Sequence, residues 1–218
     1  MAQRTIHYLF GELLFDRAHL SNKERFLLGS ILPDAIDVSC RNASHFKVKT
    51  GTHKYFDFAA FRNQYLDLML RDDLYLGYYM HLVEDAFYRA FFYTDRFTMP
   101  RTRDEVTILH NDYHILNSCI VQKYRIHNIL ADTYSLENEP LRHIAPFLID
   151  DFLGEMAHDF TEQTEGKPVY LTEHMLDEYV KTYVPLAIEE VNSIQKGASV
   201  LNVADYAWPA NDNSHSRA

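Results

Sequence analysis

Residues 74–92 read LYLGYYMHLVEDAFYRAFF, one of the most apolar and aromatic stretches of the chain. Hydrophobic residues recur there at helical spacing, which predicts a long helix over about 72–93 that is buried in the core. His81 and Asp85 lie four residues apart, so both side chains point to the same side of that helix. Since burial of an unpartnered polar group is costly, both side chains need partners inside the protein.

Similar helical patterns occur on both sides of this stretch. They cover approximately residues 5–19, 21–33, 54–70, 103–129, 140–160 and 171–195. Residues 33–53 mix Pro, Asp, Ser, Asn and Gly and predict a long irregular connection. The periodicity fades near residue 197. We therefore predict an all-α, single-domain bundle of about seven helices in residues 1–196, followed by a disordered tail in residues 197–218.

The composition of the 218-residue chain excludes several other classes of protein. Gly and Pro number only seven each, too few for a turn-rich all-β chain. The net charge of −10 disfavours a nucleic-acid polymer or an anionic membrane as the main partner, because both would repel the protein. No uninterrupted apolar run is long enough to cross a bilayer, so we expect no stable membrane insertion.

The cysteines and the first residues indicate a cellular compartment. The chain has two cysteines, Cys40 and Cys119, without a CxxC spacing, so a disulfide scaffold is not indicated and a reducing compartment fits. Residues 1–15 lack the long apolar segment and the cleavage site of a signal peptide. We expect a cytoplasmic protein, and the sequence gives no indication of its oligomeric state.

Two pairs of polar residues lie next to the predicted core. Neutral imidazoles and carboxylates are ligands for zinc and related ions, and the spacing of His81 and Asp85 lets both reach one ion. The alternative is that Asp85 bonds a buried Arg or Tyr and that His81 is a satisfied core histidine. Asp34 and Asp37 follow a helix that ends at Pro33. They are either turn-forming residues, or the loop brings one of the two carboxylates to the same ion.

Four further histidines are candidate ligands. His7 lies in the first predicted helix and His45 in the loop sequence SHF, although a core histidine and an exposed loop histidine are the alternatives. His110 and His114 have the i, i+4 spacing of a recurrent zinc-binding geometry, with a polar helix surface as the alternative. Asn111 stands where the HExxH motif has its catalytic Glu, which argues against a metalloprotease.

The ordered segments HYLFGELL, FLLGSILPDAID, SHF and LYLGYYMHLVEDAFYR resemble the zinc-dependent phospholipase C family over roughly residues 5–120. That family has an all-α fold, shared with single-strand-specific zinc nucleases, so the resemblance implies a helical bundle around a metal site. The implied ligands are His7, Asp34, His45, His81 and Asp85. Asp85 would be able to bridge two metals, and His110 with His114 stands in place of the family's later His-x-x-x-Glu pair. We expect one or two zinc ions, or other divalent metals.

The resemblance implies a metal-dependent hydrolase of phosphate esters, either a phospholipase C-like phosphodiesterase or a phosphatase. Asp34 or Asp37 would position or deprotonate the attacking water. Tyr78 and Arg89 would orient the substrate, which we expect to be a small-molecule phosphoester.

Two other functions agree with the same residues. One is a non-enzymatic helical protein in which the His/Asp set is a structural metal site, closed by protein ligands, or a buried polar network. The other is a helical phosphohydrolase acting on nucleotides, in which the adjacent residues His158 and Asp159 would be ligands.

Overall fold

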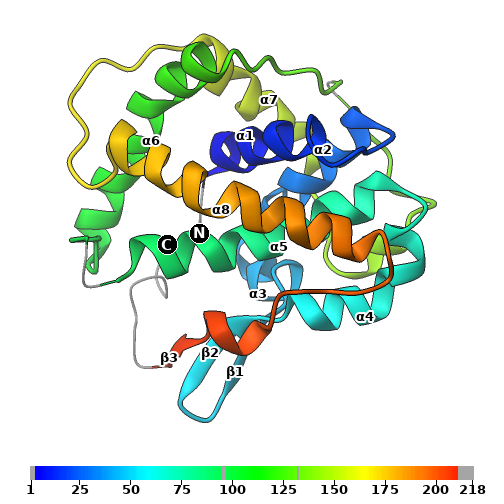
Figure 1. The fold of residues 1–218 in the computed structure, drawn as a ribbon. Coiled ribbons are helices and arrows are strands. Elements are labelled where there is room, and N and C mark those ends of the chain that lie inside the picture. The colour runs from blue at the N-terminus through cyan, green and yellow to red at the C-terminus, as the bar shows by residue number, and fades with distance from the viewer. Residues whose placement is uncertain (1–2, 95–96, 132, 211–218) are drawn as a thin grey trace.

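Helix α5 (Asp73–Phe92) runs through the middle of the molecule, and 18 of its 20 residues are buried (Figure 1). The protein is described here from a computed structural model, over residues 3–94, 97–131 and 133–210. Asp72 caps α5, because its carboxylate accepts a hydrogen bond from the Leu74 amide at 3.0 Å. The long buried helix predicted from residues 74–92 is confirmed.

The other α-helices of the described residues pack around α5 or against its neighbours. They are α1 (Arg4–Phe15), α2 (Lys23–Ile31), α3 (Arg41–Ser44), α4 (Phe58–Met69), α6 (Arg103–Tyr124), α7 (Ile149–Thr161) and α8 (Glu173–Ile194). Helices α2, α4 and α8 contact α5, and α1 contacts α2 and α8. The all-α, single-domain fold is confirmed. The helix α3 is a single turn, which leaves seven longer helices in the part of the chain that is described.

The connection predicted to be irregular has short elements of its own. After the 3₁₀ turns η1 (Leu32–Asp34) and η2 (Val38–Cys40) and the single-turn α3 come the strands β1 (Lys47–Thr50) and β2 (His53–Phe56). These strands form an antiparallel hairpin, and β3 (Trp208–Pro209) pairs with β2 to give a sheet in the order β1-β2-β3. Figure 1 shows this small sheet below α5 in the view.

Two predicted helices are shorter than expected, each for a local reason. Helix α6 ends at Tyr124 rather than near residue 129, because Arg125 adopts a left-handed conformation with φ of 54°. The helix predicted over 140–160 begins only at Ile149. Pro146 disfavours helical geometry in the residue before it, and the chain forms only the 3₁₀ turn η3 (Pro140–His143) upstream.

The disordered tail expected from residue 197 is a wrong prediction as far as residue 210. The buried carboxylate of Glu190 accepts hydrogen bonds from the amides of Val200 at 2.8 Å and Leu201 at 3.1 Å. The chain continues through η4 (Val203–Tyr206) to β3, where the Trp208 side chain is buried. The order comes from these tertiary contacts, which leave no periodicity in the sequence. Residues 211–218 lie outside the described residues.

Helices α2 and α5 cross where two glycines face each other's backbone. A Cβ atom on Gly29 would lie 2.1 Å from the Leu74 carbonyl oxygen, and one on Gly77 would lie 2.1 Å from the Phe26 carbonyl oxygen. Only glycine allows this approach. The crossing brings the end of α2 beside His81, one turn along α5 from Gly77. No helix of the described residues is long and apolar enough to cross a membrane.

Candidate metal centre

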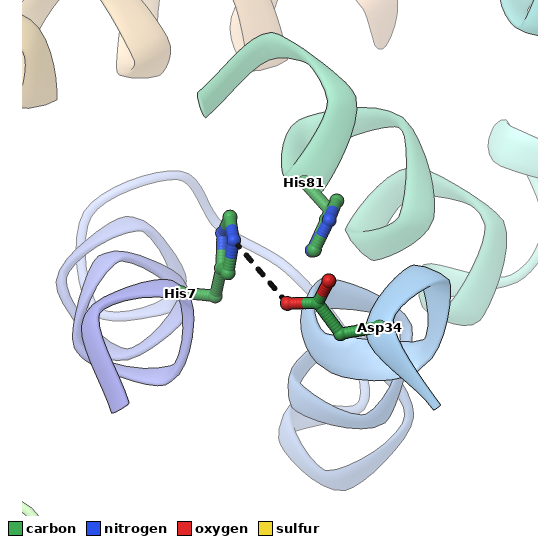
Figure 2. A group of neighbouring side chains, drawn as sticks. All are labelled: His7, Asp34 and His81. Atoms are coloured by element: carbon green, nitrogen blue, oxygen red, sulfur yellow. Dashed lines mark ion pairs between the residues drawn. The ribbon is translucent and has the colours of Figure 1, made fainter. Parts of the chain in front are cut away.

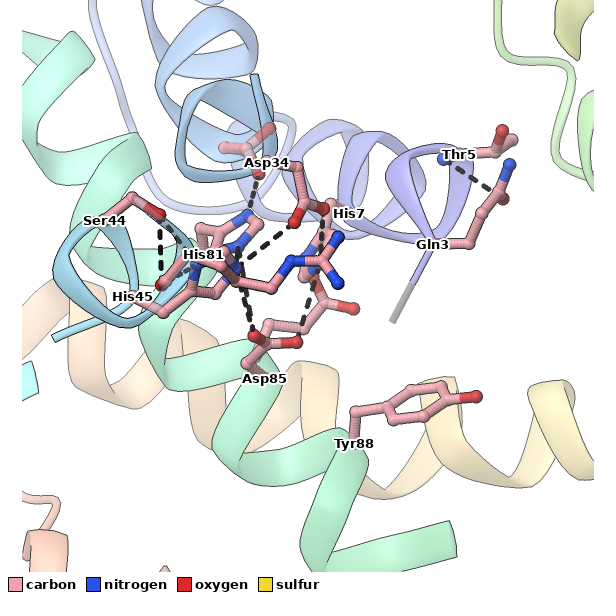
Figure 3. A network of polar contacts seen from close by, with 12 residues as sticks. Gln3, Thr5, His7, Asp34, Ser44, His45, His81, Asp85 and Tyr88 are labelled. Atoms are coloured by element: carbon pink, nitrogen blue, oxygen red, sulfur yellow. Dashed lines mark hydrogen bonds and ion pairs between the residues drawn. The ribbon is translucent and has the colours of Figure 1, made fainter. Parts of the chain in front are cut away.

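Five side chains from four parts of the fold converge beside α5. His81 and Asp85 come from α5 itself, and His7 comes from α1. Asp34 lies at the end of η1, and His45 follows α3 directly. Figure 2 shows His7, Asp34 and His81 pointing toward one another, and Figure 3 shows the wider network of contacts. The structure thus brings together the five residues that the family resemblance implies as ligands.

The Nε2 atoms of the three histidines face the two carboxylates. His45 Nε2 lies 3.2 Å from His81 Nε2 and 3.2 Å from an oxygen of Asp34. It also lies 3.6 Å from an oxygen of Asp85. His7 Nε2 is 3.7 Å from one oxygen of each aspartate, and the His7 and His81 rings stack with their centroids 3.8 Å apart. Only Asp34, with its side chain 11% exposed, is reached by solvent, because the other four side chains are fully buried.

Each histidine uses its other ring nitrogen to bond a fixed acceptor outside the centre. His81 Nδ1 donates to the Ser30 carbonyl oxygen at 2.8 Å, and His45 Nδ1 donates to the Arg41 carbonyl oxygen at 3.0 Å. His7 Nδ1 donates to the carboxylate of Glu84, which is itself buried. In the neutral form of each imidazole, these acceptors hold the proton on Nδ1, so the Nε2 lone pair is directed at the centre. Metal-binding histidines in proteins are oriented in this way.

The charges of the cluster shift its pKa values. Burial lowers the pKa of His7, but three nearby carboxylates, that of Glu84 first, outweigh it and raise the pKa to about 9. Burial and the charge of His7 lower the pKa of His81 well below its usual value. Burial alone would raise the pKa of Asp34, yet the hydrogen bond with His45 and the neighbouring imidazoles hold it well below its usual range. His7 is therefore protonated and Asp34 ionised at neutral pH.

The donor set fits a divalent metal ion. Two groups have ligand atoms within 4.8 Å of one another, namely His7, Asp34, His81 and His45, His81, Asp85. Both include His81 Nε2, which has one lone pair, so the two groups describe parts of one centre. The His7 Nε2 atom is buried and has no hydrogen-bond partner. A buried imidazole nitrogen without a partner is costly, and a cation among these five donors would satisfy it.

Three predicted site residues do not join this centre. His110 and His114 lie on the exposed face of α6, and His114 approaches Asp159 at 3.9 Å instead. The i, i+4 spacing is present, but that face of α6 points to solvent. Asp37 is exposed and caps η2, because its carboxylate accepts hydrogen bonds from the amide of Ser39 at 2.9 Å and from its hydroxyl at 2.6 Å. The turn-forming alternative describes Asp37 correctly.

The two predicted substrate-binding residues are buried. The Tyr78 hydroxyl donates to the Ser44 carbonyl oxygen at 2.6 Å, so Tyr78 supports the loop that carries His45. Arg89 is 4% exposed and lies over the ring of Trp208, 4.3 Å from its centroid. Tyr78 therefore has a positioning role, and Arg89 belongs to a second group of residues beside the centre.

The adjacent residues His158 and Asp159 do not form a metal site. His158 is exposed and pairs with Glu162 at 3.0 Å. Asp159 is buried and accepts hydrogen bonds from Arg4 at 2.5 Å and from Asn117 at 2.9 Å. Both side chains have protein partners in different directions, which argues against the nucleotide phosphohydrolase.

Sequence reasoning missed the outer partners of the histidines. Glu84 lies on a different side of α5 from His81 and Asp85, but α5 is buried on all sides, so this side meets α1 and His7. The stretch from His81 to Asp85 carries three ionisable residues in a helix that is apolar on every side. This pattern indicates that all three side chains are buried and need partners. The backbone carbonyls of Ser30 and Arg41 could not be predicted as partners from the sequence, because every residue type has a backbone carbonyl.

The comparisons with known proteins find no match for this chain. No family model matches it, and no curated protein or solved structure is significantly similar. The residues and their geometry therefore carry the functional argument.

Proposed function

We propose that this protein is a zinc-dependent hydrolase of phosphate esters. The observation that carries the proposal is the convergence of three histidine Nε2 atoms and two carboxylates, with each histidine Nδ1 bonded to an acceptor outside the centre. Histidine and aspartate together suit zinc among the common divalent ions. The choice of a phosphate ester rests on the resemblance of the ordered motifs to the zinc-dependent phospholipase C family.

The residues of such a centre would have different roles. His7, His45, His81 and Asp85 would hold the ion, because they are fully buried. When bound, zinc supplies Lewis acidity, which lowers the pKa of water and polarises a phosphoryl group. Asp34 is the one member that solvent reaches, so a substrate would approach past it. Its lowered pKa makes Asp34 a weak base, and we assign it to orienting water or substrate rather than to removing a proton.

We also propose that the protein works in the cytoplasm. Cys40 and Cys119 are both free thiols, which agrees with a reducing compartment.

A closed structural metal centre is the second candidate function. The observation in its favour is burial, because four of the five donors have fully buried side chains. A structural zinc site is closed by four protein ligands, whereas a catalytic site keeps a position for water. The four fully buried donors are by themselves enough to close such a site, so the hydrolase needs a further coordination position on the ion for water.

Metal content and activity separate the two candidates. Protein purified without chelator should hold about one equivalent of zinc, and it should hydrolyse bis(p-nitrophenyl) phosphate or p-nitrophenyl phosphate. Chelation should abolish that activity and added zinc should restore it. The matched variants are His81→Ala, which removes a central donor, and His174→Ala, which removes an 82% exposed histidine of α8. Only the first should lose metal and activity.

Three results would decide against the enzyme. Full zinc occupancy without activity, together with a lower melting temperature of His81→Ala, would support the structural site. Less than roughly half an equivalent of any transition metal, unaltered by added zinc, would exclude both candidates. Equal zinc content in the His81→Ala and His174→Ala variants would place the metal elsewhere.

A further inference from the structure

One side of α5 connects the candidate metal centre to the only tryptophan of the chain. His81, Asp85 and Arg89 follow one another at intervals of four residues and so share one side of the helix. The Arg89 guanidinium lies 4.3 Å from the centroid of the Trp208 ring. Because each helical residue advances by about 1.5 Å, Arg89 lies only about 6 Å along the axis from Asp85. Trp208 is therefore a close neighbour of the centre.

The strand register gathers lysines on the same face of the sheet as Trp208. Directly paired residues of antiparallel strands share a face. Lys47 pairs with Phe56, Lys49 with Lys54, and Lys54 with Trp208, which places all five residues on one face. The rings of Phe56 and Trp208 are in contact, 5.1 Å between centroids. We call Lys47, Lys54 and Trp208 the lysine–tryptophan face.

This face approaches the metal centre through two contacts. The ring of Phe56 lies 6.3 Å from that of His45, centroid to centroid. The ammonium of Lys47 lies 5.9 Å from the centroid of the Trp208 ring, whose other neighbour is Arg89. The face and the centre are thus linked through the buried side chains of Phe56 and Arg89.

Neither lysine of the face forms an ion pair with a described carboxylate. Lys47 and Lys54 are both half-buried, and no described carboxylate lies within 4.0 Å of either ammonium. In a chain with a net charge of −10, such a local excess of cations is a feature to be explained. Half-buried cations without counter-ions favour the binding of an anion.

We propose that the lysine–tryptophan face binds a phosphate group of the substrate, next to the ester bond at the metal centre. This inference rests on the proposed hydrolase function and narrows its substrate class to phosphoesters that carry a second phosphate. Lys47 and Lys54 donate to the phosphate oxygens, and Trp208 forms the apolar wall beside them. Lysine is a common phosphate ligand, and its ammonium forms strong hydrogen bonds with charged oxygens.

Tryptophan fluorescence tests the face directly, because Trp208 is the only tryptophan. Zinc-free protein is titrated with glycerol phosphate, with inorganic phosphate, and with sodium chloride at matched ionic strength. We expect saturable changes in emission with glycerol phosphate and none with chloride. Lys47→Met should weaken glycerol phosphate binding by about tenfold or more, whereas Lys47→Arg should retain it. Lys167→Met changes the net charge equally at an exposed loop residue and should bind like the wild type.

The use of zinc-free protein separates this inference from the proposed function, because phosphate binding at the face does not need the metal. The inference is overturned if glycerol phosphate gives no saturable change, or if Lys47→Met responds like the wild type while its emission spectrum and melting temperature show a folded protein. A response to inorganic phosphate alone would assign the face to free phosphate and overturn the role in substrate binding. An equal change in emission with sodium chloride would show that ionic strength causes the change, and it would also overturn the inference.

Discussion

Substitution of Gly77 by alanine should separate the two helices that support the candidate metal centre. A Cβ atom at Gly77 would lie 2.1 Å from the carbonyl oxygen of Phe26 in α2. To reach an ordinary contact of 3.4 Å, that separation must rise by 1.3 Å. The obstacle is a backbone atom within a helix, so no side-chain rotation relieves it. Helix α2 has to move away from α5.

The movement has a cost in stability and a second cost at the centre. Overpacking of this kind destabilises proteins by about 1–3 kcal/mol, and a backbone clash belongs at the upper end, about 3 kcal/mol. The higher helix propensity of alanine returns only about 0.5–1 kcal/mol. The Ser30 carbonyl of α2 accepts the hydrogen bond from His81 Nδ1 at 2.8 Å. A shift of 1.3 Å would lengthen that bond beyond hydrogen-bonding distance and free the His81 ring.

The matched control is Gly154→Ala in α7, where the added Cβ meets nothing within 4 Å. Urea denaturation should show Gly77→Ala less stable than the wild type by about 2 kcal/mol, and Gly154→Ala more stable by about 0.5–1 kcal/mol. Zinc titration against a chelating dye should show weaker binding only for Gly77→Ala. The reasoning fails if Gly77→Ala is as stable as Gly154→Ala, or if it binds zinc like the wild type.

Buried contacts elsewhere in the fold lead to shorter predictions. Asp112→Ala should lower the free energy of unfolding by about 3 kcal/mol, because the buried carboxylate accepts hydrogen bonds from three successive amides of residues 169–171. Urea denaturation measures this, and a loss below about 1 kcal/mol would contradict it. Glu84→Gln should weaken zinc binding about 10–100-fold with an unchanged circular dichroism spectrum, since Glu84 orients His7; an unaltered affinity in dye competition would show that Glu84 is dispensable. Zinc uptake at neutral pH should release a proton from His7, because its pKa is raised to about 9 and only the neutral imidazole binds a metal. The zinc dissociation constant should therefore fall as the pH rises toward 9, and binding enthalpies that do not depend on the ionisation enthalpy of the buffer would argue against it.

The fold was predictable where helices are long and periodic. The apolar pattern of residues 74–92 indicated α5 because a fully buried helix has little choice of composition. The hairpin of β1 and β2 was not predictable, since its strands are only four residues each. The order of residues 197–210 depends on Glu190, whose acceptor role is visible only once the chain has folded.

The candidate centre was predictable only as an ordered set of weak signals. The i, i+4 spacing of His81 and Asp85 placed both on one side of a helix, and the motifs around Asp34 and His45 follow in the order of the family. No rule of sequence shows that these distant segments meet in the folded protein. The crossing at Gly29 and Gly77 supplies the missing physical reason for two glycines of those motifs. His110 and His114 had an equally good spacing and lie at the surface. Burial, which spacing does not report, separates the two pairs.

The buried charges of the centre favour a cation over a closed polar network. Asp34, Glu84 and Asp85 bring three carboxylates together, and burial raises the pKa of Glu84 toward protonation. His7 supplies one positive charge, while burial and that charge keep His81 neutral. A closed polar network would leave the buried Nε2 atom of His7 without a hydrogen-bond partner. A divalent ion would satisfy that atom, since it takes the lone pairs of the imidazoles and offsets carboxylate charge in the same place. The same ion would leave Lys47 and Lys54 free to hold the anion that approaches it.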